Sequence, residues 1–188
     1  MFFLEYLRHP VRVGAIAPSG KPLARKMMEP VDFENARVIV EYGPGTGAFT
    51  REILARKRPE TRLICIEQND TFYREISDLC RDAENVTVVH GSAEEADALA
   101  AAQGCPQADA VISGLPFTSL PRMVSLRIFG ATQRLIGDEG AFITFQYTRV
   151  KEAFFLRHFS LVNRLRVKVN LPPAYVYVLK TKQKEARA

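Results

Sequence analysis

Short runs of apolar residues alternate along the chain with stretches in which apolar residues recur at helical spacing. The runs that predict strands are 37–41, 62–67, 86–90, 108–113, 141–147, 165–170 and 175–180. The stretches that predict helices are 21–28, 48–57, 71–81, 93–102, 121–135 and 151–159. This alternation predicts an α/β fold, with a mostly parallel sheet and helices on both of its faces.

The alternation ends near the C-terminus, where only "LPPA" separates the last two predicted strands. This link is too short for a helical crossover, so the two strands are expected to pair as an antiparallel hairpin. The predicted seven-stranded sheet therefore has five parallel-type strands followed by a hairpin.

Asp70 is expected to cap the helix at 71–81. The whole chain, 1–188, is expected to form one domain, with a charged, frayed tail at 181–188.

The composition indicates the class of protein and the cellular compartment. The 47% hydrophobic content over 188 residues is that of a globular protein, and no stretch approaches the ~18 unbroken apolar residues of a membrane span. No signal-peptide cleavage site follows "MFFLEYLRHP". Three cysteines without metal-ligand spacing, Cys65, Cys80 and Cys105, fit a reduced compartment and predict no metal site. We expect a cytoplasmic protein that can lie peripherally on the inner face of the cell membrane.

The chain is basic, with 26 Lys and Arg against 21 Asp and Glu and a net charge of +5. Such a charge favours an anionic partner, either nucleic acid or an acidic lipid surface. Charge alone does not choose between the two, and it fits a merely soluble basic protein equally well.

The segment "VIVEYGPGTGAFT" at 38–50 reads as a strand, a tight glycine turn and the start of a helix. Gly43, Gly45 and Gly47 allow the backbone to approach a ligand closely. With Glu67 about 20 residues further on, the segment also fits a dinucleotide-binding fingerprint. The glycine turn therefore predicts a nucleotide-type cofactor without fixing which one.

Glu41, just before the first glycine, distinguishes between the candidate cofactors. A carboxylate there favours a cationic ligand and disfavours a pyrophosphate. S-adenosylmethionine is cationic, has a ribose and carries no phosphate, so it is the expected cofactor. Glu67, followed by Gln68 at the cofactor side of the next strand, is expected to bind both ribose hydroxyls. Ser92 and Ala93 fall at the predicted adenine edge, where Ser92 fits a helix cap equally well.

Several segments together resemble the class I S-adenosylmethionine-dependent methyltransferases: "VEYGPGTG", Glu67 and the final hairpin. Two related branches are similar, the ribosomal RNA adenine dimethyltransferases and the short bacterial phospholipid N-methyltransferases. The second resemblance covers nearly the whole chain, through "VRVGAIAPSGKPLARKM", "EYGPGTGAFT", "VISGLPF" and "NLPPAYVY". It implies a Rossmann-like methyltransferase sheet and methylation of phosphatidylethanolamine to mono-, di- or trimethylated forms.

The segment "SGLPF" at 113–117 separates the two branches. The RNA branch has Asn at the position of Gly114, and its carbonyl accepts a hydrogen bond from the exocyclic amine of adenine. An aliphatic amine loses its donors as methyl groups accumulate, so it gains more from space and an aromatic wall. We expect Gly114 to supply space and Phe117 the wall, with Ser113 on the cofactor side. A core position under the following helix fits Phe117 equally well.

The resemblance also implies roles for the start of the chain. Residues 1–20 are expected to form a lid over the cofactor, with Ser19 near its carboxylate. The apolar block 2–7, followed by Arg8 and Arg12, predicts a segment that lies in a lipid headgroup layer, although packing on the domain core explains it equally well. The segment 154–168 is also basic and apolar, but its phenylalanines are expected in the core.

Methyl transfer to an amine also benefits from a proton acceptor, for which Tyr6, His9, Tyr147 and His158 are candidates. The expected substrate is a phospholipid headgroup at the membrane surface. The RNA branch carries a further helical domain, and this chain ends at the hairpin without basic residues interleaved with stacking aromatics. An RNA adenine, a small-molecule amine and a cofactor-binding role without catalysis remain alternatives.

Overall fold

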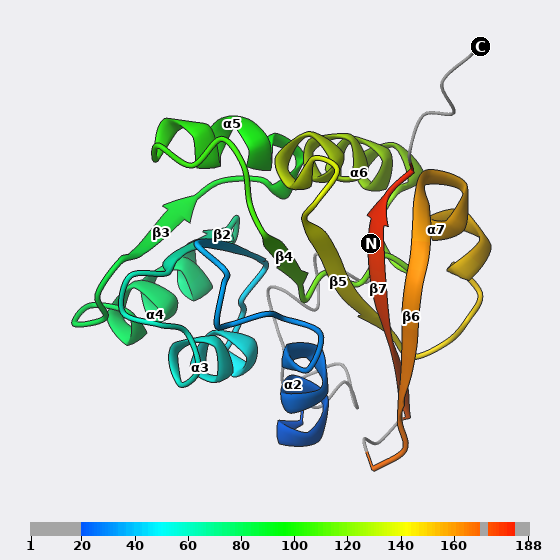
Figure 1. The fold of residues 1–188 in the computed structure, drawn as a ribbon, viewed down its shortest axis with the longest axis horizontal. Coiled ribbons are helices and arrows are strands. Elements are labelled where there is room, and N and C mark those ends of the chain that lie inside the picture. The colour runs from blue at the N-terminus through cyan, green and yellow to red at the C-terminus, as the bar shows by residue number, and fades with distance from the viewer. Residues whose placement is uncertain (1–19, 170–172, 183–188) are drawn as a thin grey trace.

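The computed structural model describes residues 20–169 and 173–182. Seven strands form one sheet in the order β3-β2-β1-β4-β5-β7-β6 (Figure 1). They are β1 (Val38–Tyr42), β2 (Arg62–Glu67), β3 (Val86–His90), β4 (Ala110–Ser113), β5 (Ala141–Gln146), β6 (Phe159–Val167) and β7 (Ala174–Thr181). The first five are parallel, whereas β7 is antiparallel to both β5 and β6. The predicted sheet with its terminal hairpin is confirmed.

Helices cover both faces of this sheet (Figure 1). One face is covered by α2 (Lys21–Met28), α3 (Ala48–Leu54) and α4 (Asp70–Leu79). The other is covered by α5 (Ala96–Ala102), α6 (Arg122–Ile136) and α7 (Glu152–His158). Because side chains alternate along a strand, Ile39 of β1 packs in the first layer and Val40 in the second.

Several element boundaries differ from those predicted. Asn69, rather than Asp70, caps α4, because its side-chain oxygen accepts hydrogen bonds from the backbone amides of Thr71 and Phe72. The predicted helix at 93–102 divides into a 3-10 turn, η1 (Ala93–Glu95), and α5. β6 begins at Phe159 rather than at 165, because it pairs with β7 along nearly its whole length. Partner strands of this kind cannot be read from local periodicity.

The predicted lid at 1–20 lies outside the described residues apart from Gly20, and so do Tyr6, His9 and Ser19. The predicted tail at 181–188 is described only at Thr181 and Lys182. Within 20–169 and 173–182, no helix has the length and apolar character needed to cross a membrane.

The topology brings five loops to one edge of the sheet. In parallel strands the carboxyl ends align, so the loops after β1, β2, β3, β4 and β5 lie along this edge. The strand order reverses between β1 and β4, which are neighbours in space but not in sequence. Ligands of open α/β sheets bind at such a reversal.

Candidate active site

The loop after β1 is shaped by glycines. Gly43 and Gly47 adopt φ angles of 60° and 79°, which favour glycine over other residues. The Gly43 amide donates to the carbonyl of Ile66 on β2 at 2.9 Å, which holds the loop against the next strand. Among the described residues, a Cβ atom at Gly45 would meet only the Gly43 carbonyl oxygen, at 4.0 Å, so they leave this side of the loop open.

Glu67, at the end of β2, is buried and joins two loops. Its Oε2 accepts from the Gly45 amide at 3.1 Å, and its Oε1 accepts from the Asn69 amide at 2.9 Å. A carboxylate oxygen has about two acceptor sites, so each oxygen can take one further hydrogen bond. Gln68 is exposed beside it. The glycine loop and the end of β2 thus form one unit around a buried carboxylate.

The side chain of Glu41 lies in the core, whereas the sequence predicts a charged side chain at the cofactor. Its side chain is fully buried against α3, where Oε2 accepts from Thr50 Oγ1 at 2.8 Å and from Cys65 Sγ at 3.6 Å. Burial raises the pKa of Glu41 to about 8, so the carboxyl is largely neutral at pH 7. The expectation of a fixed negative charge at the cofactor is therefore corrected. Among the described residues, Oε1 of Glu41 has no hydrogen-bond partner.

The end of β3 carries the predicted adenine edge. Ser92 caps η1, since its Oγ accepts from the Glu94 amide at 3.2 Å, and Ala93 is buried behind it. The alternative reading of Ser92 as a cap is confirmed. A cap hydroxyl retains a donor hydrogen, so this arrangement does not exclude contact with a ligand.

Sequence reasoning missed His90, the last residue of β3. Its ring stacks on Tyr73 with centroids 4.9 Å apart, and its Nε2 lies 3.1 Å from both Asp70 Oδ1 and the carbonyl oxygen of Gln68. This imidazole connects β3 to the loop that follows Glu67. A histidine at a strand end opposite an acidic helix start was the available signal.

Gly114, directly after β4, is packed tightly against the glycine loop. Its amide donates to the Tyr42 carbonyl at 3.0 Å, and a Cβ atom at this position would lie 2.9 Å from the Gly43 carbonyl oxygen. The space that the sequence suggested along this side-chain direction is therefore occupied by backbone. Ser113 beside it is buried, and its Oγ accepts from the Leu115 amide at 3.2 Å.

Phe117 belongs to the core. It is fully buried, and its ring contacts those of Phe129, Phe142 and Phe155 at centroid distances of 5.2 to 6.1 Å. The expected aromatic wall at Phe117 is corrected to a core position under α6. Tyr147 follows β5 and packs edge-on to Phe145 at 5.3 Å, in the layer of α3. The two predicted aromatic residues thus lie in opposite layers.

A row of buried polar side chains was also missed. Tyr42, Ser113, Thr144 and Tyr177 are paired across four neighbouring strands, so they face the same layer. Thr144 is fully buried, and its hydroxyl has no partner within the described part of the chain. Thr144 and Gln146 alternate in "AFITFQ", which was a usable signal for a polar position near the carboxyl end of β5.

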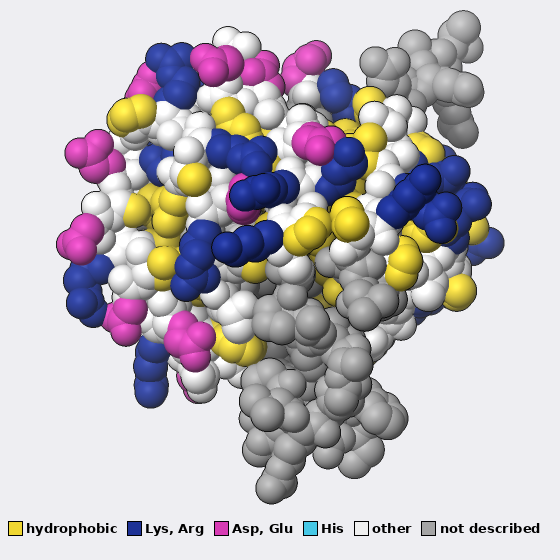
Figure 2. All heavy atoms as spheres, turned by 90° about the horizontal axis from the view of Figure 1, so that it is seen from below, with side chains coloured by type: hydrophobic (Ala, Val, Ile, Leu, Met, Phe, Trp, Pro, Cys, Tyr) yellow, Lys and Arg dark blue, Asp and Glu magenta, His cyan; other side chains and the backbone are white. Residues whose placement is uncertain are grey.

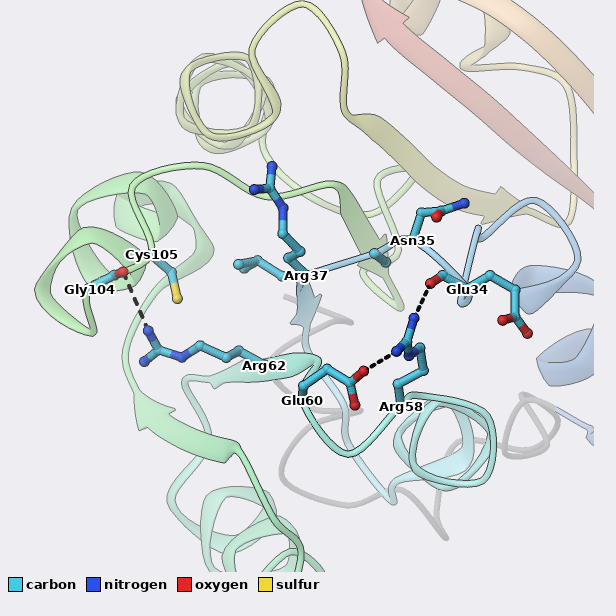
Figure 3. A pocket seen from close by; sticks show the side chains of 10 residues that line it. Glu34, Asn35, Arg37, Arg58, Glu60, Arg62, Gly104 and Cys105 are labelled. Atoms are coloured by element: carbon cyan, nitrogen blue, oxygen red, sulfur yellow. Dashed lines mark hydrogen bonds and ion pairs between the residues drawn. The ribbon is translucent and has the colours of Figure 1, made fainter.

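A cavity of about 440 Å³ lies elsewhere, at the amino ends of β1 and β2 (Figure 3). Two of its three arginines are held by the protein itself: Arg62 donates to the carbonyls of Gln103 and Gly104, and Arg58 to that of Glu34. The cavity is at the edge of the sheet opposite the glycine loop, so it is not the candidate active site. Across residues 20–169 and 173–182, no cluster of three or more His, Cys, Asp or Glu could hold a metal ion.

Comparison with known proteins identifies a relative along nearly the whole chain and another along half of it. No protein-family model matches it. The ornithine lipid N-methyltransferase of Singulisphaera acidiphila is 32% identical over 179 residues, which cover 94% of this chain and 93% of that protein. The ribosomal RNA small subunit methyltransferase A of Phenylobacterium zucineum is 30% identical over 95 residues, or 50% of this chain and 32% of that protein.

A solved structure agrees at the level of the fold. The 1,6-didemethyltoxoflavin-N1-methyltransferase of Burkholderia thailandensis, with S-adenosylhomocysteine bound, has a TM-score of 0.73 and 15% identity. The match covers 97% of this chain and 86% of that one. This structural match and the relative that aligns along nearly its full length lead to one conclusion. The chain belongs to the class I S-adenosylmethionine-dependent methyltransferases, in the family of the ornithine lipid N-methyltransferase.

Proposed function

We propose that the protein methylates the aliphatic amine of a membrane-lipid headgroup, with ornithine lipid as the first candidate. The observation that carries this proposal is the 32% identity to an ornithine lipid N-methyltransferase across 94% of the chain. Phosphatidylethanolamine, which the sequence motifs favour, is the second candidate. Its headgroup also ends in a primary aliphatic amine, so both lipids pose the same chemical problem.

The cofactor edge fits S-adenosylmethionine in three respects. The open side of Gly45 leaves room for close approach of a ligand, and the buried Glu67 retains acceptor capacity for two ribose hydroxyls. Oε1 of Glu41, without a partner among the described residues, carries the proton when the carboxyl is neutral and can donate one hydrogen bond to a ligand. We place the adenine between Gln68 and the pair Ser92 and Ala93, as the resemblance implies.

The proposed chemistry relies on positioning. The bound cofactor supplies a methyl group on a positively charged sulfur. An aliphatic amine has an ordinary pKa of ~10 and must be neutral when it attacks. The hydrogen bond from the Gly43 amide to Ile66 holds the loop after β1, and that from the Gly114 amide to Tyr42 holds the loop after β4. Holding the reactants in line in a dry site can account for most of the acceleration. Of the two described candidates for proton acceptor, Tyr147 follows β5 at this edge, whereas His158 ends α7 with its ring against Phe129 and Phe154. Tyr6 and His9 lie outside the described residues.

Methylation of an RNA adenine is the weaker alternative. The ribosomal RNA methyltransferase matches only 50% of this chain. Gly114 offers no side-chain acceptor for an exocyclic amine, and the Gly43 carbonyl leaves no space for one without a backbone shift.

The direct test supplies labelled S-adenosylmethionine and four acceptors in parallel. These are ornithine lipid and phosphatidylethanolamine in neutral detergent micelles, free ethanolamine, and ribosomal RNA. We expect label in one or both lipids. Label in RNA, or in free ethanolamine but not in lipid, would contradict the proposal.

A further inference from the structure

The positive charge of the protein is concentrated near its C-terminal end. Residues 149–182 contain eight Lys and Arg and one acidic residue, Glu152. Of the 26 basic and 21 acidic residues in the chain, this leaves 18 basic against 20 acidic for the rest. The net charge of +5 therefore arises entirely from the segment that forms α7, β6 and β7.

The same segment exposes apolar side chains. Val150, Leu161, Val162 and Val169 are 82%, 38%, 57% and 84% exposed. In the described part of the chain, the one other exposed large hydrophobic residue is Met123. Val162 is the extra residue of a β-bulge between Leu161 and Asn163, so it takes no place in the pairing with β7.

These basic and apolar residues share one side of the molecule. β6 is one of the two edge strands of the described sheet, and α7 lies next to it (Figure 1). On the right of Figure 2, Lys and Arg side chains gather among hydrophobic ones over these elements. We call this the α7–β6 surface. It consists of the four apolar residues above and the exposed basic residues Arg149, Arg157, Arg164, Arg166 and Lys168.

We propose that the α7–β6 surface docks the enzyme on an anionic lipid bilayer. Basic side chains are attracted to the negative surface of such a membrane, and exposed aliphatic residues gain by entering its headgroup layer. Docking here keeps the enzyme at the interface that contains its substrate. The inference rests on the proposed function for its purpose, but its physical basis, charge and exposed apolar surface, is independent of the reaction.

Two other occupants fit the surface less well. Pairing of β6 with a second copy would bring Arg164 and Arg166 close to their equivalents, and charged residues on an edge strand oppose such pairing. RNA binding calls for free aromatic faces on which bases stack. On this surface, the Tyr175 ring is already contacted by Arg166, whose guanidinium carbon lies 6.0 Å from the ring centroid.

The test is vesicle co-sedimentation of the full-length protein. Phosphatidylcholine vesicles with and without phosphatidylglycerol are compared at low and high salt. The charge variant is Arg166→Ser with Lys168→Ser, and the apolar variant is Val162→Ser with Val169→Ser. A matched control, Arg74→Ser with Arg81→Ser, removes two exposed arginines from the region of α4. Circular dichroism and cofactor binding check that each variant is folded.

We expect the wild type to bind the anionic vesicles and to dissociate at high salt. The charge variant should bind them on the order of 10-fold more weakly, and the control should bind as the wild type does. The apolar variant should also bind the anionic vesicles more weakly than the wild type at low salt. Unchanged binding of both surface variants would overturn the proposal. Loss of self-association or of RNA binding, with vesicle binding intact, would assign the surface to a second copy or to RNA instead.

The assay separates this inference from the proposed function. Methyl transfer to lipid in neutral detergent micelles needs no anionic bilayer, so the surface variants should retain wild-type activity there. If the wild type labels no lipid in micelles while the vesicle results hold, the proposed function fails and the docking surface stands. If the wild type labels lipid in micelles and both surface variants bind vesicles as the wild type does, the proposed function stands and the docking surface fails.

Discussion

Glu41 is the residue at which burial and charge conflict most strongly. It lies in the core between β1 and α3, and both of its donors, Thr50 and Cys65, bind the same oxygen. Burial raises its pKa from the ordinary value of 4.5 to about 8. The folded state therefore holds a proton that the unfolded chain releases above pH 4.5.

The raised pKa of Glu41 makes the stability of the fold depend on pH. Glu41 favours the folded state fully below pH 4.5, and this contribution is lost as the pH rises towards about 8. Glu41→Gln cannot release a proton, so its free energy of unfolding should fall less over this range, by about 5 kcal/mol. Urea unfolding of both proteins without cofactor at several pH values checks this. Parallel pH profiles would show that Glu41 does not carry the effect.

The tight packing around Gly114 leads us to expect that a larger residue there weakens cofactor binding. In Gly114→Ala the new Cβ would lie 2.9 Å from the Gly43 carbonyl oxygen, so the glycine loop must shift. We expect roughly 10-fold weaker binding of S-adenosylmethionine, equivalent to about 1.4 kcal/mol. Gly130→Ala is the control, because within the described part of the chain its Cβ would meet only the end of Arg134 at 3.4 Å. That control should bind normally and gain up to ~1 kcal/mol in stability. Calorimetric titration distinguishes the two.

The residues of the site were only partly predictable. The glycines follow from a local pattern, because a tight turn between a strand and a helix needs them, and Glu67 follows from its place at the end of the next predicted strand. The surroundings of Glu41 and Phe117 depend on which layer each side chain enters. Phe117 meets Phe129 and Phe142, which are distant in sequence, and no local pattern contains that contact.

At the scale of elements, the end of β2 and the glycine loop depend on one carboxylate. Glu67→Gln keeps the size of the side chain, but only its remaining oxygen can accept, so it cannot accept from both the Gly45 and the Asn69 amides. We expect S-adenosylmethionine to bind about 10- to 100-fold more weakly, as for loss of a hydrogen bond to a charged group. Glu75→Gln on the exposed side of α4 is the matched control. Equal affinities in both variants would contradict the role of Glu67.

A second carboxylate, Glu152 at the start of α7, ties that helix to the final hairpin. It accepts from Arg149 and Arg164 at 2.5 Å each and from the Tyr177 hydroxyl at 3.3 Å. Arg149 is the main cause of its lowered pKa, so the stabilisation is present at neutral pH and is lost as the pH falls.

Glu152→Gln should therefore lower the free energy of unfolding by about 1 kcal/mol at pH 7 and by less in acid. Thermal unfolding of this variant beside Glu139→Gln, an exposed acidic residue near the end of α6, measures the difference. A loss that is the same at pH 7 and pH 4 would assign the effect to packing instead of charge.

Elements also show where sequence patterns fail. Strands β1 to β5 and helix α2 follow closely from apolar runs and helical spacing. The boundary between α7 and β6 does not, because the apolar residues around Phe159 fit a helix and a strand equally well. Pairing of Phe159 with Thr181 decides the outcome, and that contact joins residues far apart in the chain.

For the molecule as a whole, the glycine loop lies at the carboxyl ends of the parallel strands, and the terminal hairpin forms one side of the sheet. The first feature fits a cofactor, and the second carries the positive charge of the chain. Overall composition gave the sign of the charge. The sequence places the excess of basic residues at 149–182, and the structure adds that they share one surface with exposed apolar side chains.

The central claim is that this cofactor edge delivers methyl groups to a lipid amine. Mass spectrometry of ornithine lipid and phosphatidylethanolamine, after incubation with the enzyme and S-adenosylmethionine, tests it most directly because fragmentation locates each added methyl. We predict methyl groups on the terminal aliphatic nitrogen, formed at a much lower rate by Glu67→Gln. Unmodified lipids in the presence of an enzyme that binds the cofactor would contradict the account.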